Sequence, residues 1–568
     1  MAGAQGISPI AHPNATVNPK RRAGGQEASP PAGLCDTLRP LVTSSSSLFS
    51  VARRHWAALL GSLLLLPHAL YFNFVNDDAY ISFRYAKNLA EHGQLVFNLG
   101  ERVEGFTNFL WTVMLALAMK VGAPPEHASR VLGIVFGMGG LFVVNRITLR
   151  LDEGRPRAAH ALATVGLAFT AAYACWCTGG LETQLFTLLF LLATSAFLLE
   201  LDGAPGNKSA VWFALAGMTR PEGVLLFGLA GFFRLLHMVL AERRWVPARR
   251  EVAWVVLFLA VFAPYFAWRW WYFGWPLPNT FYVKSSGGAG ALPWGLYYLR
   301  RFAEDHILYL LVPLGLAGFA HRQDARRFRL FCFGTLVLTV FAAYTAKVGG
   351  DFMGLYRFVL PVMPLAALML AESLRHLGRQ LQGYVPSALQ VTVAVVLLGA
   401  YGVGQVKVSE QGMNLIGADR GIDTPGYLKQ YADERIAVGR WFAQHARPDD
   451  LMTVGGAGVI PYYSGIKSYD VFGLVDEHIA HDRSMTVSQR PGHQKWGSDA
   501  YMLSRKPTLI THIYHLHARA ADNVDYWRAQ GYEWVTATIP GLTDPPLYSF
   551  LKRADRAFGP FPATEQSP

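Results

Sequence analysis

Long apolar runs, repeated along most of the chain, restrict its fold more than any other feature. Runs of about 18–22 apolar residues, such as 57–75, 252–271 and 328–346, have the length that a helix needs to cross a bilayer. Of the 568 residues, 52% are hydrophobic and only 16% are charged. A chain this long and this apolar is not a set of soluble domains. The sequence therefore predicts a polytopic α-helical membrane protein.

The apolar runs predict about eleven transmembrane helices. They lie near residues 56–75, 128–149, 158–177, 182–200, 209–219, 222–240, 252–272, 306–320, 328–346, 356–373 and 386–404. The fifth is short and is separated from the sixth by Arg220-Pro221, a break that is tolerated only against protein or a wet cavity. The segment 107–121 is apolar for about fifteen residues, but counting it as a span would put the Arg-rich turns outside, so we expect it to form a helix along the outer membrane interface.

Basic residues predict the orientation of these helices. The net charge of +12 comes mostly from Lys and Arg between the apolar runs, which favours a role in membrane orientation over nucleic-acid binding. The connections rich in Arg are expected in the cytoplasm, together with residues 1–50, a tail whose Ser, Pro, Gly and Arg content predicts disorder. The opposite connections, including a first periplasmic loop at 76–127, contain most of the distinctive motifs.

The composition changes after the last predicted span. Apolar runs shorten in residues 405–568, and helical patterns alternate with strand-like ones at 451–454, 467–472, 508–511 and 534–539. This pattern predicts a soluble α/β domain on the periplasmic side. The chain is thus expected to consist of the tail 1–50, a membrane module 51–404 and this domain.

An acidic pair, Asp77-Asp78, directly follows the first apolar run and is the first candidate for catalysis. Carboxylates at a membrane edge are costly unless they line a cavity, and two adjacent ones push their pKa values apart, so that one can act as a base. The pair is also a candidate ligand for a divalent cation. The alternative is a helix N-cap with favourable dipole placement.

Other polar residues of the predicted periplasmic connections are candidates for substrate binding. Glu104 and Asn108 are spaced i, i+4 where a helix enters the interface, whereas Arg220 and Glu222 could equally form a buried structural ion pair. Cations near the interface suit a lipid phosphate, although each could also be a snorkelling anchor. The substrate-binding candidates are Arg84, Glu104, Asn108, Arg220, Glu222, Asn279, Lys284, Lys347, Asp351 and Arg357.

Several familiar nucleotide motifs are missing from the sequence. It contains no P-loop, no dinucleotide-binding glycine fingerprint and no nucleophile elbow, which argues against a nucleotide-driven pump. The histidines at 512, 515 and 517 have no carboxylate or Cys at a typical zinc spacing, so packing or surface positions are favoured for them.

At this point the motifs resemble a known family. The pattern of Asp77-Asp78-Ala79-Tyr80-Ile81, Arg84-Tyr85, Val96-Phe97-Asn98, Val103-Glu104-Gly105 and Thr107-Asn108 is similar to the first outer loop of bacterial GT-C glycosyltransferases. Further similar motifs are Thr219-Arg220-Pro221-Glu222-Gly223, Leu277-Pro278-Asn279-Thr280, Gly349-Gly350-Asp351-Phe352 and Asp470-Val471-Phe472-Gly473-Leu474-Val475-Asp476. Within the superfamily, the chain resembles the group of terminal β-(1→2)-arabinofuranosyltransferases.

This resemblance implies a polyprenyl-phosphate-linked sugar donor, an envelope glycan, glycolipid or protein acceptor, and a location among the lipids of a bacterial inner membrane. It implies a catalytic Asp in the first loop, with Asp77 the first choice as base and Asp78 the alternative. Aromatic residues around the acidic pair depart from the arabinofuranosyltransferase pattern, which leaves the sugar open. The rival functions are transfer of another group from a lipid donor, and a transporter or flippase for a lipid-linked sugar, which would need matched halves with broken helices.

Overall fold

The computed structural model describes residues 45–284, 290–419, 421–486, 492 and 494–556. Most of the predicted tail, residues 1–44, therefore lies outside the described residues. The chain divides into two compact units, Met1–Ser50 and Val51–Pro568. The fold described below is that of the second unit.

Seven helices in the described part of the chain are long and apolar enough to cross a membrane. They are α1 (Ser45–Phe72), α4 (Pro125–Leu151), α7 (Thr183–Leu201), α9 (Glu222–Leu240), α10 (Arg249–Phe273), α14 (Ala325–Val348) and α16 (Ser387–Asn414). An eighth span results if α12 (Ala291–Asp305) and α13 (Leu308–Leu316) count as one, although they are bent by 82° at the break. The polytopic helical fold is therefore confirmed.

The number of long apolar helices is smaller than the eleven predicted. The run 158–177 is interrupted at Thr170, where ψ is 116°, and forms α5 (His160–Phe169) and α6 (Ala171–Cys175). The run 209–219 forms α8 (Lys208–Thr219), which has only 12 residues. The run 356–373 forms a 3-10 turn and then α15 (Met363–Gln380), whose second half carries several charges. Apolar composition alone did not reveal these breaks.

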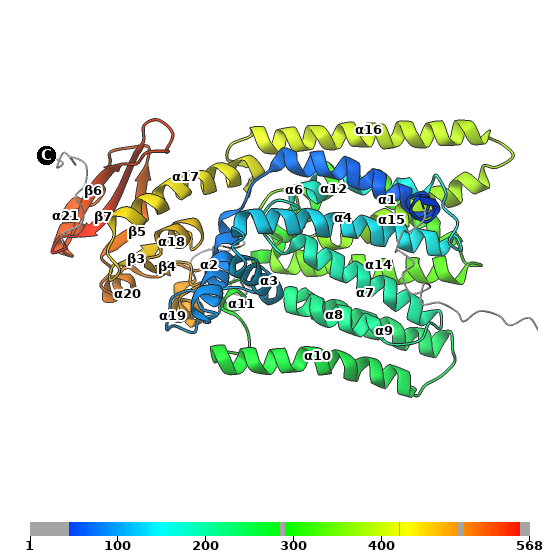
Figure 1. Ribbon diagram of the computed structural model, residues 1–568, viewed down its shortest axis with the longest axis horizontal. Coiled ribbons are helices and arrows are strands. Elements are labelled where there is room, and N and C mark those ends of the chain that lie inside the picture. The colour runs from blue at the N-terminus through cyan, green and yellow to red at the C-terminus, as the bar shows by residue number, and fades with distance from the viewer. Residues whose placement is uncertain (1–44, 285–289, 420, 487–491, 493, 557–568) are drawn as a thin grey trace, which may run out of the picture. The chain divides into compact units, whose positions relative to one another are not determined.

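Exposure separates the centre of the helix bundle from its periphery. In the most apolar 18-residue stretch of each helix, 72% of the residues are buried in α7, compared with 11% in α10 and 6% in α16. The two exposed helices lie at opposite edges of the bundle (Figure 1). Most of their apolar side chains are exposed, which suits contact with lipid tails.

Two shorter helices follow α1 and lead into the bundle. The first, α2 (Asp77–His92), is amphipathic and buries residues 79–86, and the second, α3 (Phe109–Lys120), has 12 residues. A helix of this length is about 18 Å long and falls short of a bilayer core. A helix is thus present within 107–121 as predicted, and its location along the outer interface stays a prediction. Another short helix, α11 (Asn279–Lys284), follows α10.

A C-terminal α/β domain follows α16, and its presence is confirmed. Its five-stranded sheet has the order β4-β3-β5-β7-β6, in which β4, β3 and β5 are parallel and the last two pairings are antiparallel. The strands are β3 (Leu451–Val454), β4 (Lys467–Asp470), β5 (Leu509–Leu516), β6 (Tyr532–Thr538) and β7 (Leu547–Arg553). The helices are α17 (Pro425–His445), α18 (Val459–Ser464), α19 (Glu477–His481), α20 (Asp499–Ser504) and α21 (Val524–Ala529).

The core of this domain forms between α17 and the sheet. Val438 and Phe442 of α17 are fully buried with Met452, Leu509 and Phe550 from the strands. Along the chain, α17 connects α16 to the sheet (Figure 1). A two-stranded ribbon, β1 (Ala418–Asp419) and β2 (Ile422–Asp423), lies between the two helices in sequence.

Candidate active site

Asn76 joins three loops at one end of the helix bundle. It is the N-cap of α2, and its side-chain oxygen accepts a hydrogen bond from the Asp78 N–H at 2.8 Å. Its own backbone N–H donates to the Gly179 carbonyl at 3.1 Å, and its side-chain amide contacts the sulfur of Met353 at 3.4 Å. The predicted motifs at 77–78, 178–183 and 349–352 are therefore held close together.

Asp77 lies against the C-terminal domain. Its Oδ1 accepts a hydrogen bond from the Val459 N–H, at the first residue of α18, with a distance of 2.9 Å. The preceding Gly458 packs so closely that a Cβ there would lie 2.6 Å from Asp77 Cγ. The carboxylate of Asp78, by contrast, has no hydrogen bond or ion pair within the described residues. The two carboxylates thus have different surroundings, and a division of roles between them stays a prediction.

The surroundings of Asp77 change its acidity. Burial above all, together with the adjacent Asp78, raises the pKa of this carboxyl to about 6, even though the Val459 N–H and the Arg435 guanidinium act to lower it. A carboxyl with a pKa near 6 is ionised at neutral pH and is a stronger base than an ordinary aspartate. This acidity is suitable for a general base.

Arg435 is a residue of this site that sequence reasoning missed. It lies on α17, with its guanidinium carbon 3.2 Å from the ring centre of Tyr431, and it donates hydrogen bonds to the Tyr431 carbonyl and the Tyr514 hydroxyl. A Cβ on Gly456 would lie 3.0 Å from Tyr431 Oη and 3.1 Å from Asp77 Oδ2, so both oxygens face the same side of this glycine. No motif marked Arg435 in the sequence, because its role depends on how the C-terminal domain packs onto α2.

Arg84 has a different role from the predicted one. Its guanidinium donates to the carbonyls of Phe97, at 2.8 Å, Pro461 and Ile466, and to the Asn98 side chain. These bonds connect α2 to α18 and to the segment that follows it, and they leave few donors for a substrate. Arg84 therefore positions the C-terminal domain on the first loop.

A chain of buried polar side chains extends from the first loop into the bundle. Asn108 donates to Glu182 at 2.9 Å, and Glu182 lies 3.8 Å from Arg220, which forms a closer ion pair with Glu222 at 3.2 Å. The Tyr344 hydroxyl donates to Glu222 at 3.3 Å. Arg220 is buried, and its Nη1 has no hydrogen-bond partner among the described residues. The sequence left open a structural pair or substrate binding, and this free donor is compatible with both.

Glu104 and Asn279 connect the first loop, α11 and the C-terminal domain. The backbone N–H of Asn279 donates to the Glu104 carbonyl at 3.0 Å, and its side-chain amide contacts the carbonyls of Gly473 and Leu474 at 3.4 Å. Burial raises the pKa of the Glu104 carboxyl to about 8, although Arg269, 3.5 Å away, lowers it. The motif 470–476 that carried part of the resemblance is therefore a docking segment for the first loop.

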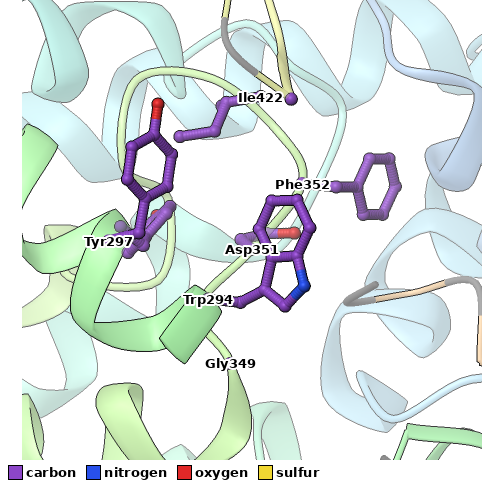
Figure 2. A pocket seen from close by; sticks show the side chains of 8 residues that line it. Trp294, Tyr297, Gly349, Asp351, Phe352 and Ile422 are labelled. Atoms are coloured by element: carbon purple, nitrogen blue, oxygen red, sulfur yellow. The ribbon is translucent and has the colours of Figure 1, made fainter. Parts of the chain in front are cut away.

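Asp351 and Arg357 form a buried ion pair beside a small aromatic pocket. The Arg357 Nε donates to Asp351 Oδ2 at 2.8 Å. The pocket is lined by Trp294, Tyr297, Tyr298, Gly349, Asp351, Phe352, Gly421 and Ile422. Figure 2 shows the Trp294 and Tyr297 rings flanking Asp351, with Ile422 on the far side of the pocket. The volume of this pocket is about 10 Å³, which is room for about one water molecule, so it does not accommodate a sugar ring in this conformation.

The remaining candidates lie at the surface. Lys284 at the end of α11 and Lys347 near the end of α14 are exposed, and neither forms an ion pair with any described residue. No group of three or more His, Cys, Asp or Glu side chains suited to a metal is present in the described part of the chain. The divalent cation at the acidic pair stays a prediction.

Sequence comparisons agree with the resemblance in the motifs. The chain is 29% identical over 324 residues to the terminal β-(1→2)-arabinofuranosyltransferase of Mycobacterium tuberculosis, a match that covers 49% of each chain. It is 28% identical over 411 residues to the enzyme of the same name from Corynebacterium glutamicum, covering 65% of this chain and 57% of that one. The matches thus span about half the length of these relatives. Residues 425–556 match the model of a domain of unknown function (DUF8728).

The fold comparison covers nearly the whole chain. The crystal structure of ArnT from Cupriavidus metallidurans bound to undecaprenyl phosphate superposes with a TM-score of 0.52 and 14% identity, covering 89% of this chain and 98% of that one. The chain therefore shares the fold of that protein. In this chain, the C-terminal domain contributes directly to the surroundings of the first-loop carboxylates, through Val459 and Arg435.

Proposed function

We propose that this protein is a membrane glycosyltransferase that transfers a sugar from a polyprenyl-phosphate donor to a hydroxyl group of an envelope glycan, glycolipid or protein. The reaction would take place on the periplasmic face of a bacterial inner membrane. Arabinofuranose is the first candidate sugar, because the curated relatives are named arabinofuranosyltransferases. The observation that carries the proposal is the acidic pair, held between the end of α1 and the C-terminal domain.

The chemistry requires a base and a way to stabilise a leaving phosphate. Asp77 would take the proton of the acceptor hydroxyl as its oxygen attacks the anomeric carbon, and the bond from that carbon to the phosphate oxygen would break. Its pKa of about 6 supports this role, because the carboxylate is ionised at neutral pH but still basic. Asp78, which has no partner among the described residues, would orient the acceptor or a bound cation.

Cations near the interface would bind the donor phosphate. Of the predicted cationic residues, Arg84 and Arg357 already have protein partners, whereas Lys284 and Lys347 are exposed without ion-pair partners in the described chain. The two lysines are therefore our candidates for binding the phosphate, and the unpaired Nη1 of Arg220 is a candidate for a substrate oxygen deeper in the bundle. A phosphate is a competent leaving group, so positioning and charge neutralisation would supply most of the rate.

The test is transfer from synthetic polyprenyl-phosphate sugars by the purified full-length protein. A panel with arabinofuranose and hexose donors, analysed by mass spectrometry of the product, would identify the group transferred. Product formation that requires Asp77 supports the proposal. Vectorial movement of the intact donor across vesicles, with no product for any acceptor, would instead support a flippase.

A further inference from the structure

A wide polar cavity lies at the opposite end of the helix bundle from Asp77. Helices α4 and α7 begin near the candidate active site and end at Asp152 and Asp202, whereas α14 begins after Asp324 and ends near Lys347. The three aspartates therefore mark the far end. The cavity has a volume of about 660 Å³ and is lined by Leu151, Asp152, Glu153, Arg155, Arg157, Asp202, Gln323, Asp324, Ala325, Arg326, Arg327 and Arg329.

Three of the four carboxylates that line this cavity form ion pairs, whereas Glu153 is exposed and has none with any described residue. Asp152 pairs with Arg327 at 2.7 Å and with Arg375 at 2.6 Å, and the buried His160 lies 2.8 Å away. Asp202 forms close ion pairs with Arg150 and Arg329, and a longer one with Arg326 at 3.7 Å. Asp152 is almost completely buried, so these pairs are shielded from solvent. They fix the positions of the arginines around the cavity.

Arginines outnumber the carboxylates at this end. Five arginines and four carboxylates line the cavity. Three more arginines behind them, Arg150, Arg375 and Arg379, form ion pairs with Asp152 or Asp202. Among the described residues, these three arginines add one further carboxylate, Glu372, which pairs with Arg375. The side chains of Arg157 and Arg326 are each 51% exposed, so they face solvent. Arg155 is exposed and has no ion pair with any described residue. The cavity therefore has cationic groups available for an anion.

We propose that this cavity binds the phosphate group of an anionic phospholipid. Arginines recognise phosphate through paired hydrogen bonds, and a cavity of this volume is within the usual range for small-molecule sites. It lies where three apolar helices end, at the depth of lipid headgroups, which favours a lipid over a soluble anion. The distribution of basic residues also predicts that this end faces the cytoplasm, where anionic lipids attract cationic segments. The site is separate from the transfer reaction proposed above.

Binding of phosphatidylglycerol to the full-length protein in detergent, measured by native mass spectrometry, tests this proposal. The variant Arg155→Gln with Arg326→Gln removes two exposed cations. Asp202 loses its 3.7 Å contact with Arg326 but keeps its closer ion pairs with Arg150 and Arg329, and the ion pairs of Asp152 are unchanged. We expect it to weaken phosphatidylglycerol binding on the order of tenfold. The control is Arg300→Gln with Arg528→Gln. These two arginines do not line the cavity and their side chains are 74% and 75% exposed, so their loss should leave phosphatidylglycerol binding unchanged.

Two further probes distinguish the source of the phosphate. Phosphatidylcholine, which has no net charge, should bind more weakly than phosphatidylglycerol and should not depend on Arg155 or Arg326. Inorganic phosphate should displace phosphatidylglycerol only at much higher concentrations. Equal phosphatidylglycerol binding by wild type and the cavity variant would overturn the site. Binding of inorganic phosphate that depends on the two arginines, without competition from phosphatidylglycerol, would overturn the lipid assignment.

Discussion

The Asp77 carboxylate accepts a hydrogen bond from the backbone N–H of Val459, 382 positions away in the sequence, at 2.9 Å. The bond joins the loop after the first membrane helix to the short helix α18 of the C-terminal domain. It makes that domain a part of the candidate active site. Changes on either side of this contact should therefore alter catalysis, including changes in residues that cannot contact a substrate.

Gly458→Ala is the sharpest such change. The new Cβ would lie 2.0 Å from the Asp77 carbonyl oxygen and 2.6 Å from its Cγ, so the loop or the aspartate must move. Overpacking of this kind costs about 1–3 kcal/mol of stability. A displacement of about 1 Å in a catalytic group can lower the rate about a hundredfold, which is the loss in kcat that we expect.

Gly455→Ala is the matched control for this variant. It lies in the same loop, and a Cβ there would meet only His512 Cα, 4.0 Å away. Transfer rate and thermal unfolding midpoint should both stay close to wild type. Equal activity of the Gly455 and Gly458 variants would show that the contact with Asp77 is unimportant for turnover.

The pH dependence of transfer should follow Asp77. A base must be deprotonated to act, so kcat/KM should fall as the pH decreases through about 6, the raised pKa of this carboxyl. Arg435 lowers that pKa. Replacing its charge in Arg435→Met should therefore move the acid limb of the pH profile to a higher pH.

Arg440→Met provides the comparison, because Arg440 is exposed on the same helix and does not contribute to the pKa of Asp77. Its acid limb should coincide with that of wild type. A profile that is unchanged in Arg435→Met, or that shifts equally in both variants, would disconnect Arg435 from the ionisation of the base.

Arg220→Met should destabilise the protein strongly. It would leave Glu182 and Glu222 buried near each other without their shared cation. Removing one partner of a buried pair costs about 3–5 kcal/mol. Arg300→Met, which removes an exposed arginine paired with Glu304, should change the stability little, because solvent screens an exposed pair. Chemical or thermal unfolding in detergent measures both, and similar losses would argue that the Arg220 network contributes little.

The sequence predicted the class of fold and several elements of the C-terminal domain. The lengths of the apolar runs located the membrane helices, and the alternation of apolar and polar residues located the strand 451–454, because both are local properties of the sequence. Helix α5 and helix α15 were mistaken for complete spans, since a break at Thr170 and a charged second half do not remove the apolar signal. The strand β7, which completes the sheet between β5 and β6, had no expected counterpart.

The candidate site was predictable only where its residues belong to motifs. The clustering of the acidic pair with the loops at 178–183 and 349–352 agrees with the expected convergence at one face. Arg84 is a cation in the first-loop motif and was predicted to bind substrate, but its guanidinium donates to backbone carbonyls. Arg435 does not belong to any of the motifs. Both depend on long-range packing of α17 and α18 against α2, which no local pattern contains.

The most direct test of the account compares transfer by Asp77→Asn and Asp78→Asn with wild type, using a polyprenyl-phosphate sugar donor and the full-length protein. Asparagine retains an oxygen that can accept from the Val459 N–H, so the contact with α18 should survive and the fold with it. We expect Asp77→Asn to lower kcat by about a hundredfold to ten-thousandfold, and Asp78→Asn to have the smaller effect. Full transfer activity in both folded variants would contradict the assignment of the acidic pair as the catalytic centre.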